Sequence, residues 1–259
     1  GDGATDFNLS SSGTYDRVVT PAMATLLSLS SNSESSAIPI FNFDFFGTTQ
    51  NSIVISSQVY LRFDNTPLPS PTPSENELIP SAAGVDNIIA PARDFYDINS
   101  GGSVRYWTEG TAPFRVFYVD FENIYRNASF DVTTQVKLFE STKIIEIHTE
   151  SALFATNGVM ATQGIEDATG TLGYTTVGRN DQSWDATNDI ISFVPTCLDE
   201  LTVNVNGVPV AEAGSDVNLC NGETVILGGT PSATGGSGTY SYSWSPATGL
   251  SSTTSSNPV

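Results

Sequence analysis

His148 is the only histidine in the 259-residue chain, so any mechanism that needs an imidazole has to use it. It stands near the end of a strand-like run. The sequence contains no Gly-x-Ser-x-Gly motif that would present a serine nucleophile. We therefore interpret His148 as a structural residue of a β-sheet rather than as a catalytic base.

Asp120 and Glu122 are the carboxylates whose spacing could do chemistry. Residues two apart on a strand project from the same face, and a pair of carboxylates is what a glycosidase requires. The same spacing also arises whenever apolar and polar residues alternate along a strand, and no second acidic strand is evident. We interpret the pair as the polar face of a strand and predict that the chain is not an enzyme.

Metal sites are weakly indicated. Zinc needs three or four histidine or cysteine ligands, and the chain has three such residues in total, scattered along the sequence. Calcium takes clustered oxygen ligands, and the sequence contains no EF-hand motif. We therefore interpret the loop carboxylates as solvated rather than as calcium ligands. No cofactor is predicted, and calcium binding stays the open alternative. The carboxylates that could serve calcium are Asp181, Asp185 and Asp189, and then Asp199, Glu200 and Asp216.

The formal charge of −19, from 28 acidic and 9 basic residues, excludes some partners. A surface of this sign repels a phosphate backbone, so nucleic acid is not an expected partner. No stretch is long and apolar enough to span a bilayer, and membrane insertion is not expected either.

The elements that would position these residues read as strands. With 22 Gly, 14 Pro and only 14% charged residues, the composition suits a turn-rich β protein and not a helical bundle. Between residues 113 and 149, apolar and polar residues alternate in three successive runs, which predicts an antiparallel meander. The five prolines of residues 64–87 predict an extended surface loop. Further strands are predicted at 15–19, 23–29, 104–107, 159–165, 174–177 and 190–194.

Several segments resemble, in pattern and order, the nidogen-like extracellular domains carried by large secreted surface proteins of the Bacteroidetes type. The matching segments are Ile38–Gly47, Ile53–Phe63, Phe130–Glu140, Ile144–His148 and Gln163–Gly170, with a partial match at Ile89–Asp97. The family's usual Asn-Gly turn in the second segment is replaced here by Gln58-Val59. The resemblance covers residues 7–196 and carries no catalytic motif. It implies an antiparallel β-sandwich over residues 1–196, a bacterial cell-surface location and export by type IX secretion.

From Ala211 the composition shifts to Gly, Ser, Thr and Pro, and residues 211–259 resemble the PKD-like immunoglobulin-fold repeats of bacterial surface proteins. The resemblance is carried by Cys220-Asn221-Gly222, Gly235–Gly238 and Tyr242–Pro246, with Trp244 expected to plug the core between two sheets. Because an immunoglobulin fold usually needs about 100 residues, we expect an incomplete repeat here. Residues 197–210 would be the connector, and further repeats of the same polypeptide are expected beyond Val259.

Cys197 and Cys220 are the only cysteines in the chain. They flank the connector, and secretion into an oxidising environment would favour a disulfide between them. The alternative is that Cys220 pairs with a cysteine beyond Val259 and that Cys197 stays free. The sequence leaves both open.

The leading prediction is a non-enzymatic extracellular part of a long cell-surface protein of the adhesin, gliding-motility or surface-fibre type. Its β-domains would serve adhesion or act as spacers, and the loops at 64–87 and 178–189 would meet surface glycans or proteins. The alternative is a carbohydrate-binding accessory module of a secreted polysaccharide-degrading enzyme. A row of exposed aromatic side chains would favour that alternative, and the candidates are Tyr106, Trp107, Tyr118 and Tyr125.

Overall fold

The computed structural model describes residues 6–68, 78–126, 129–196, 207–236 and 239–259. The chain divides into two compact units, residues 1–198 and residues 199–259. The described residues contain no α-helix, only the 3-10 turn η1 (Ile98–Ser100), and none of them forms a helix with the length and hydropathy needed to cross a membrane. The all-β fold class predicted from composition and periodicity is confirmed.

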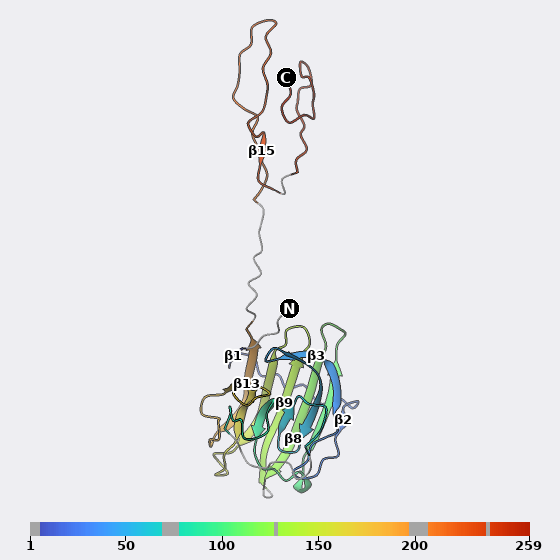
Figure 1. The fold of residues 1–259 in the computed structure, drawn as a ribbon, viewed down its shortest axis with the longest axis vertical. Coiled ribbons are helices and arrows are strands. Elements are labelled where there is room, and N and C mark those ends of the chain that lie inside the picture. Colours follow the sequence, from blue (N-terminus) through green and yellow to red (C-terminus); the bar gives the residue numbers. More distant parts are fainter. Residues whose placement is uncertain (1–5, 69–77, 127–128, 197–206, 237–238) are drawn as a thin grey trace. The chain divides into compact units, whose positions relative to one another are not determined.

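Two antiparallel sheets face each other in the first unit (Figure 1). One sheet has seven strands in the order β1-β13-β10-β9-β8-β7-β2, and the other has six in the order β12-β11-β6-β5-β4-β3. The strands of the first sheet are β1 (Phe7–Ser10), β2 (Thr25–Leu26), β7 (Ser103–Glu109), β8 (Val116–Arg126), β9 (Ser129–Phe139), β10 (Ile145–Leu153) and β13 (Asp185–Pro195). Those of the second are β3 (Ile38–Phe45), β4 (Thr48–Ser56), β5 (Tyr60–Arg62), β6 (Ile88–Arg93), β11 (Thr162–Glu166) and β12 (Gly173–Thr175).

The predicted meander forms the centre of the seven-stranded sheet. Val136 of β9 lies opposite Val119 of β8 on one side and Ile147 of β10 on the other. All three side chains belong to the buried core, as period-two alternation requires when one face of a sheet is buried. The polar residues between them therefore project from the outer face of this sheet.

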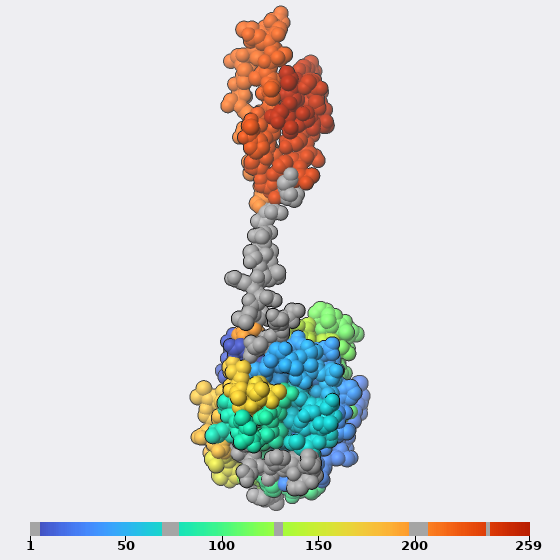
Figure 2. Space-filling model, viewed as in Figure 1, coloured from blue at the N-terminus to red at the C-terminus, as the bar shows by residue number. Residues whose placement is uncertain are grey.

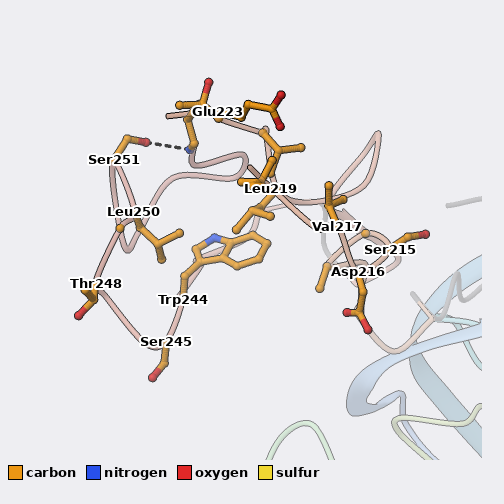
Figure 3. Close-up of a pocket in the computed structure, with 17 residues that line it drawn as sticks. Ser215, Asp216, Val217, Leu219, Glu223, Trp244, Ser245, Thr248, Leu250 and Ser251 are labelled. Carbon is orange, nitrogen blue, oxygen red and sulfur yellow. Dashed lines mark hydrogen bonds between the residues drawn. The ribbon is translucent and has the colours of Figure 1, made fainter. Parts of the chain in front are cut away.

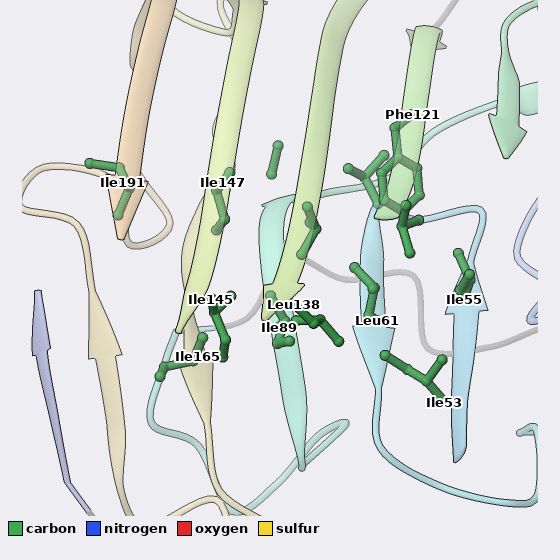
Figure 4. Packing of buried hydrophobic residues seen from close by; sticks show 14 of the residues in the cluster. Ile53, Ile55, Leu61, Ile89, Phe121, Leu138, Ile145, Ile147, Ile165 and Ile191 are labelled. Carbon is green, nitrogen blue, oxygen red and sulfur yellow. The ribbon is translucent and has the colours of Figure 1, made fainter. Parts of the chain in front are cut away.

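The main core fills the space between the two sheets (Figure 4). Ile53, Leu61 and Ile89 come from the six-stranded sheet, and Phe121 and Leu138 come from the seven-stranded one. Each of these side chains is fully buried, and truncating such a residue to alanine typically costs about 2–5 kcal/mol.

The six-stranded sheet carries a second, smaller cluster on its outer face. Ile88 and Ala90 alternate with the core residue Ile89 along β6, and they pack in this cluster with Ile79 and Val85. The Pro-rich segment at 64–87 is therefore not only a surface loop, because the described residues near its end cover the sheet. In Figure 2, much of the visible surface of the first unit is coloured blue to green and comes from the six-stranded sheet and its loops.

Two tight turns have particular backbone requirements. The β4–β5 turn is a tight one although Val59 stands where the nidogen-like pattern has glycine; Val59 is fully buried and has a φ of 55°. Such a value is unfavourable for a β-branched residue. Gly102, just before β7, has a φ of 89°, and a Cβ added there would lie 2.3 Å from the carbonyl oxygen of Asn123. That close approach excludes other residues.

The prediction of a strand at residues 15–19 is wrong. These residues have no strand pairing, and the run at 23–29 contributes only the two-residue β2 at the edge beside β7. Residues 14–24, called the strap below, instead cross the outer face of the seven-stranded sheet. The hydrogen bonds that the strap backbone makes with the sheet go to side chains of the sheet.

The second unit has little regular structure among its described residues. The paired strands among the residues described in this unit are β14 (Val210–Ala211) and β15 (Ala233–Thr234), each two residues long. The rest of its described chain runs through turns and extended segments.

Candidate functional site

The residues to which the sequence assigns chemistry come together under the strap. His148 of β10, Asp120 of β8 and their neighbours on β9 all project from the outer face of the seven-stranded sheet, where solvent would be expected. They are buried because the strap crosses β10, β9 and β8 in turn and hydrogen-bonds to each of them.

Asp120 is the central anchor of the strap, and its side chain is 1% exposed. Its Oδ1 accepts hydrogen bonds from Arg17 Nε at 3.0 Å and Gln135 Nε2 at 3.0 Å. Its Oδ2 accepts from Arg17 Nη2 at 2.9 Å and Thr20 Oγ1 at 2.7 Å. These four bonds use the acceptor capacity of the carboxylate, two per oxygen.

Glu122 lies beside two arginines. It is 40% exposed, and one of its oxygens lies 3.9 Å from Arg17 Nη2 while the other lies 3.3 Å from Arg105 Nη1. Glu150 makes a third acidic contact with Arg17, at 2.7 Å. The carboxylates that sequence spacing places on one face thus neutralise two arginines.

His148 is fixed on both ring nitrogens. Its Nδ1 accepts the backbone N–H of Asp16 at 3.1 Å, and its Nε2 lies 2.9 Å from Glu146 Oε2. Accepting at Nδ1 leaves the proton on Nε2, which donates to Glu146. Among the described residues, neither nitrogen contacts a serine, threonine or cysteine side chain.

Gln135 and Lys137 hold the middle of the strap from β9. The Gln135 side chain imitates a backbone pairing: its Oε1 accepts the N–H of Val18 and its Nε2 donates to the carbonyl of Val18, both at 3.0 Å. The Lys137 ammonium donates to the carbonyl of Asp16 and lies 3.8 Å from Asp16 Oδ2. Burial lowers the pKa of Lys137, although the negative charges of Asp16 and Glu146 act to raise it.

Sequence reasoning identified Asp120, Glu122 and His148 but missed their partners Arg17, Thr20 and Gln135. Arg17 is separated from Asp120 by 103 positions, and no local pattern links the two. The one available signal is the scarcity of basic residues, because an arginine within a chain of such negative charge is a strong candidate for an internal ion pair.

A second buried ion pair lies on the six-stranded sheet. Glu34, whose side chain is fully buried, accepts from Arg62 Nη2 at 2.9 Å and from the Tyr60 hydroxyl at 2.9 Å. It also accepts the backbone N–H of Leu68 at 2.6 Å, which ties the start of the Pro-rich segment to the sheet. Burial and the charge of Glu34 raise the pKa of Tyr60 to about 12.

The loop predicted at 178–189 ends where β13 begins, so Asp185 and Asp189 lie in that strand. Asp181, Asp185 and Asp189 are not brought together as calcium ligands. Asp185 accepts the hydroxyl and backbone N–H of Thr156, and that hydroxyl lowers the pKa of the Asp185 carboxyl. Asp189 pairs with Arg179. Over the described ranges no group of three or more His, Cys, Asp or Glu side chains is placed to hold a metal ion. Asp199 and Glu200 lie outside those ranges, and Asp216 is exposed in the second unit.

The aromatic candidates do not form an exposed row. Trp107 and Tyr118 are buried and stack on each other on the outer face of the seven-stranded sheet, with ring centroids 4.8 Å apart and an interplanar angle of 4°. Tyr106 packs against the core with its ring 5.9 Å from that of Phe117, and Tyr125 is half-buried.

The second unit has a groove of about 870 Å³ around Trp244 (Figure 3). Leu219 and Leu250 lie beside the indole ring, whereas Asp216 projects away from it. Trp244 is half-buried, and its Nε1–H donates to the carbonyl of Ser255 at 2.8 Å. It borders an open groove with a mixed polar and apolar lining, whereas the PKD-like resemblance predicts that it is enclosed between two sheets.

Cys220 is exposed in the second unit, and Cys197 lies outside the described residues. Their disulfide therefore stays a prediction.

The first unit matches a known protein family. A family model described as NIDO related matches residues 6–200, which is most of the chain and nearly all of the first unit. It does not extend over the second unit beyond residue 200. No curated protein and no solved structure matches the chain.

Proposed function

The chain belongs to the NIDO-related family, and from that premise we propose that it is a non-enzymatic, extracellular part of a larger bacterial cell-surface protein. A NIDO-related domain fits an extracellular β-domain, and the nidogen-like resemblance read from the sequence is confirmed over this range. The proposal adds that the whole protein is an adhesin, a gliding-motility component or a surface fibre of the Bacteroidetes type, exported by type IX secretion. In it, residues 211–259 are part of a PKD-like repeat and further repeats follow.

One observation supports the non-enzymatic part of the proposal above all. The two groups best suited to catalysis, the Asp120 carboxylate and the His148 imidazole, are used to hold the strap. A general base must reach the proton that it removes from substrate, and a carboxylate that already accepts four hydrogen bonds is a poor candidate.

Charge supports the extracellular role. A net charge of −19 keeps a protein soluble and opposes self-association, which suits an extended surface protein. The proposed partners are glycans or proteins at other cell surfaces, with the loops at the ends of the sandwich as the contact region.

The purified chain tests the proposal directly. It is incubated with peptide, ester, glycoside and phosphate substrates, with and without calcium, and we expect no turnover. Turnover that disappears in His148→Ala or Asp120→Asn would overturn the non-enzymatic role. Attachment of chain-coated beads to cells then separates adhesion, which gives attachment, from a spacer, which gives none.

A further inference from the structure

A groove of about 540 Å³ opens beside the strap, on the outer face of the seven-stranded sheet. This volume falls within the range of roughly 300–1,000 Å³ that is common for small-molecule sites. The groove has buried polar residues in its floor and exposed residues at its rim, which is the usual construction of a ligand site. The lining residues that could meet a ligand are Tyr15, Asp16, Tyr118, Lys137, Glu146 and His148.

The groove contains aromatic rings that are held in place. Tyr118 stacks on Trp107, and the Trp107 indole N–H donates to Glu109 Oε1 at 3.0 Å, which fixes the stack. The Tyr15 ring lies 6.0 Å from the His148 imidazole. Tyr118 is only 7% exposed and one face of its ring lies against Trp107, whereas Tyr15 is half-buried. The Tyr15 ring is therefore the one that can offer an apolar face to the C–H face of a sugar ring.

Several polar atoms of the groove make no hydrogen bond to another residue in the described part of the chain. The hydroxyls of Tyr15 and Tyr118 make no hydrogen bond to another described residue, and Glu146 uses Oε2 for His148 but not Oε1. Burial is the largest cause that raises the pKa of both tyrosines, so both hydroxyls stay protonated at neutral pH and can donate. Donors and acceptors therefore lie close together, as the hydroxyls of a sugar require.

Charge decides between classes of ligand. Asp16 and Glu146 outnumber Lys137 at the groove, and the chain as a whole is strongly negative. A phosphate, sulfate or uronate would be repelled, and an ammonium ligand would meet the charge of Lys137. An uncharged polyhydroxylated ligand incurs neither cost.

We propose that this groove binds a short, neutral glycan, with the ring of Tyr15 as its platform and the hydroxyls of Tyr15 and Tyr118 and the Glu146 carboxylate as hydrogen-bonding partners. The inference rests on the proposed function only in that the domain binds rather than catalyses. It also gives the carbohydrate-binding alternative a location in this fold.

The test is an array of glycans that end in neutral hexoses, fucose or N-acetylhexosamines, beside sialylated, sulfated and uronate-containing ones, probed with the full chain. The strongest neutral glycan is then titrated calorimetrically against Tyr15→Phe, Tyr118→Phe and Glu146→Gln. Each tyrosine variant keeps its ring and removes no protein hydrogen bond, so it should fold. We expect each tyrosine variant to bind about tenfold more weakly, as loss of one hydrogen bond implies. Tyr106→Phe, on the opposite face of the same sheet, should bind as the unaltered chain does.

Three results would each overturn the proposed glycan site. They are no binding on the array, binding of acidic glycans alone, and binding of a neutral glycan that is unchanged in both tyrosine variants. If the chain attaches to cells but binds no glycan, the proposed glycan site is overturned and the proposed adhesion still stands. Turnover of a substrate would instead overturn the non-enzymatic role, whatever the array shows.

Discussion

At the scale of single residues, the Asp120 carboxylate accepts four hydrogen bonds, which use its acceptor capacity within the protein. Replacing it by asparagine keeps the shape but removes the charge opposite Arg17, whose side chain is only 15% exposed. Breaking a buried ion pair leaves one charge uncompensated, and we expect Asp120→Asn to lower the free energy of unfolding by about 3 kcal/mol.

The matched control for Asp120→Asn is Glu150→Gln, which removes a carboxylate from the same arginine at a site that is 50% exposed. Exposed ion pairs contribute about 0–1 kcal/mol, so the control should change stability by no more than that. Urea unfolding measures both variants, and equal losses would contradict the role assigned to Asp120.

Val59 carries opposing contributions at a single position. Its side chain is buried in the main core, but its φ of 55° suits glycine. At an ordinary buried strand position, such as Val119, glycine should be worse than alanine by about 0.5–1 kcal/mol. At Val59 we expect the reverse order, with Val59→Gly more stable than Val59→Ala, because only glycine relieves the backbone strain. The two pairs of variants are compared by urea unfolding, and the same order at both positions would contradict the strain.

Tyr60 predicts a dependence of stability on alkaline pH. Its pKa is about 12 in the folded chain because of burial and the charge of Glu34, against 10.0 for an ordinary tyrosine. A raised folded-state pKa contributes stability that is present below pH 10 and is lost as the pH rises towards 12. From pH 8 to pH 11 this contribution should fall by about 1.4 kcal/mol. Unfolding measured at both pH values should show that part of the loss missing in Tyr60→Phe, and an identical loss in both proteins would contradict the assignment.

At the scale of elements, the strap is held by side chains and is therefore separable from the sheet below it. The backbone N–H of Val18 bonds to Gln135 Oε1, and that of Asp16 bonds to His148 Nδ1. In Gln135→Leu we expect the amides of the strap to exchange hydrogen much faster while those of β8 and β10 keep their protection, because local opening exposes only the strap. Hydrogen exchange followed by mass spectrometry distinguishes these segments.

The control for the strap is Gln182→Leu, an exposed residue in the segment between β12 and β13. It should leave exchange in the strap unchanged. Uniform loss of protection across the sheet in Gln135→Leu, or no change at all, would show that the strap is not an independent element.

The strands that alternation predicts best are those of the meander. The alternation of apolar and polar residues is enough to predict that the core-facing side chains include Val119, Val136 and Ile147. The strand register follows because that face must be buried. The strap could not be predicted in the same way. Residues 15–19 have strand-like composition, but their hydrogen bonds depend on Gln135 and His148, more than a hundred positions away. Alternation predicts which side chains lie on the outer face of the sheet, but not whether another segment of the chain covers them.

The same limit applies to the candidate site. Sequence spacing identifies Asp120 and Glu122 as neighbours on one face, and the fold keeps them so. Whether such carboxylates are free for chemistry depends on Arg17, and that contact exists only in three dimensions.

At the scale of the whole molecule, the few cations act as internal cross-links. Of the nine basic residues, at least seven pair with a described carboxylate: Arg17, Arg62, Arg105, Arg115, Arg126, Lys137 and Arg179. The excess of acidic residues is thus left to the surface, where it favours solubility.

The main core and the outer cluster of the six-stranded sheet both lie within the first unit, which predicts that this unit unfolds on its own. Ending the chain at Leu198 should leave its free energy of unfolding unchanged within about 0.5 kcal/mol, the usual limit for independent sites. Calorimetry of the shortened and full chains, each with and without a reducing agent, measures this and separates any effect of a Cys197–Cys220 disulfide. A large loss of stability in the shortened chain under reducing conditions would mean that residues 199–259 stabilise the sandwich.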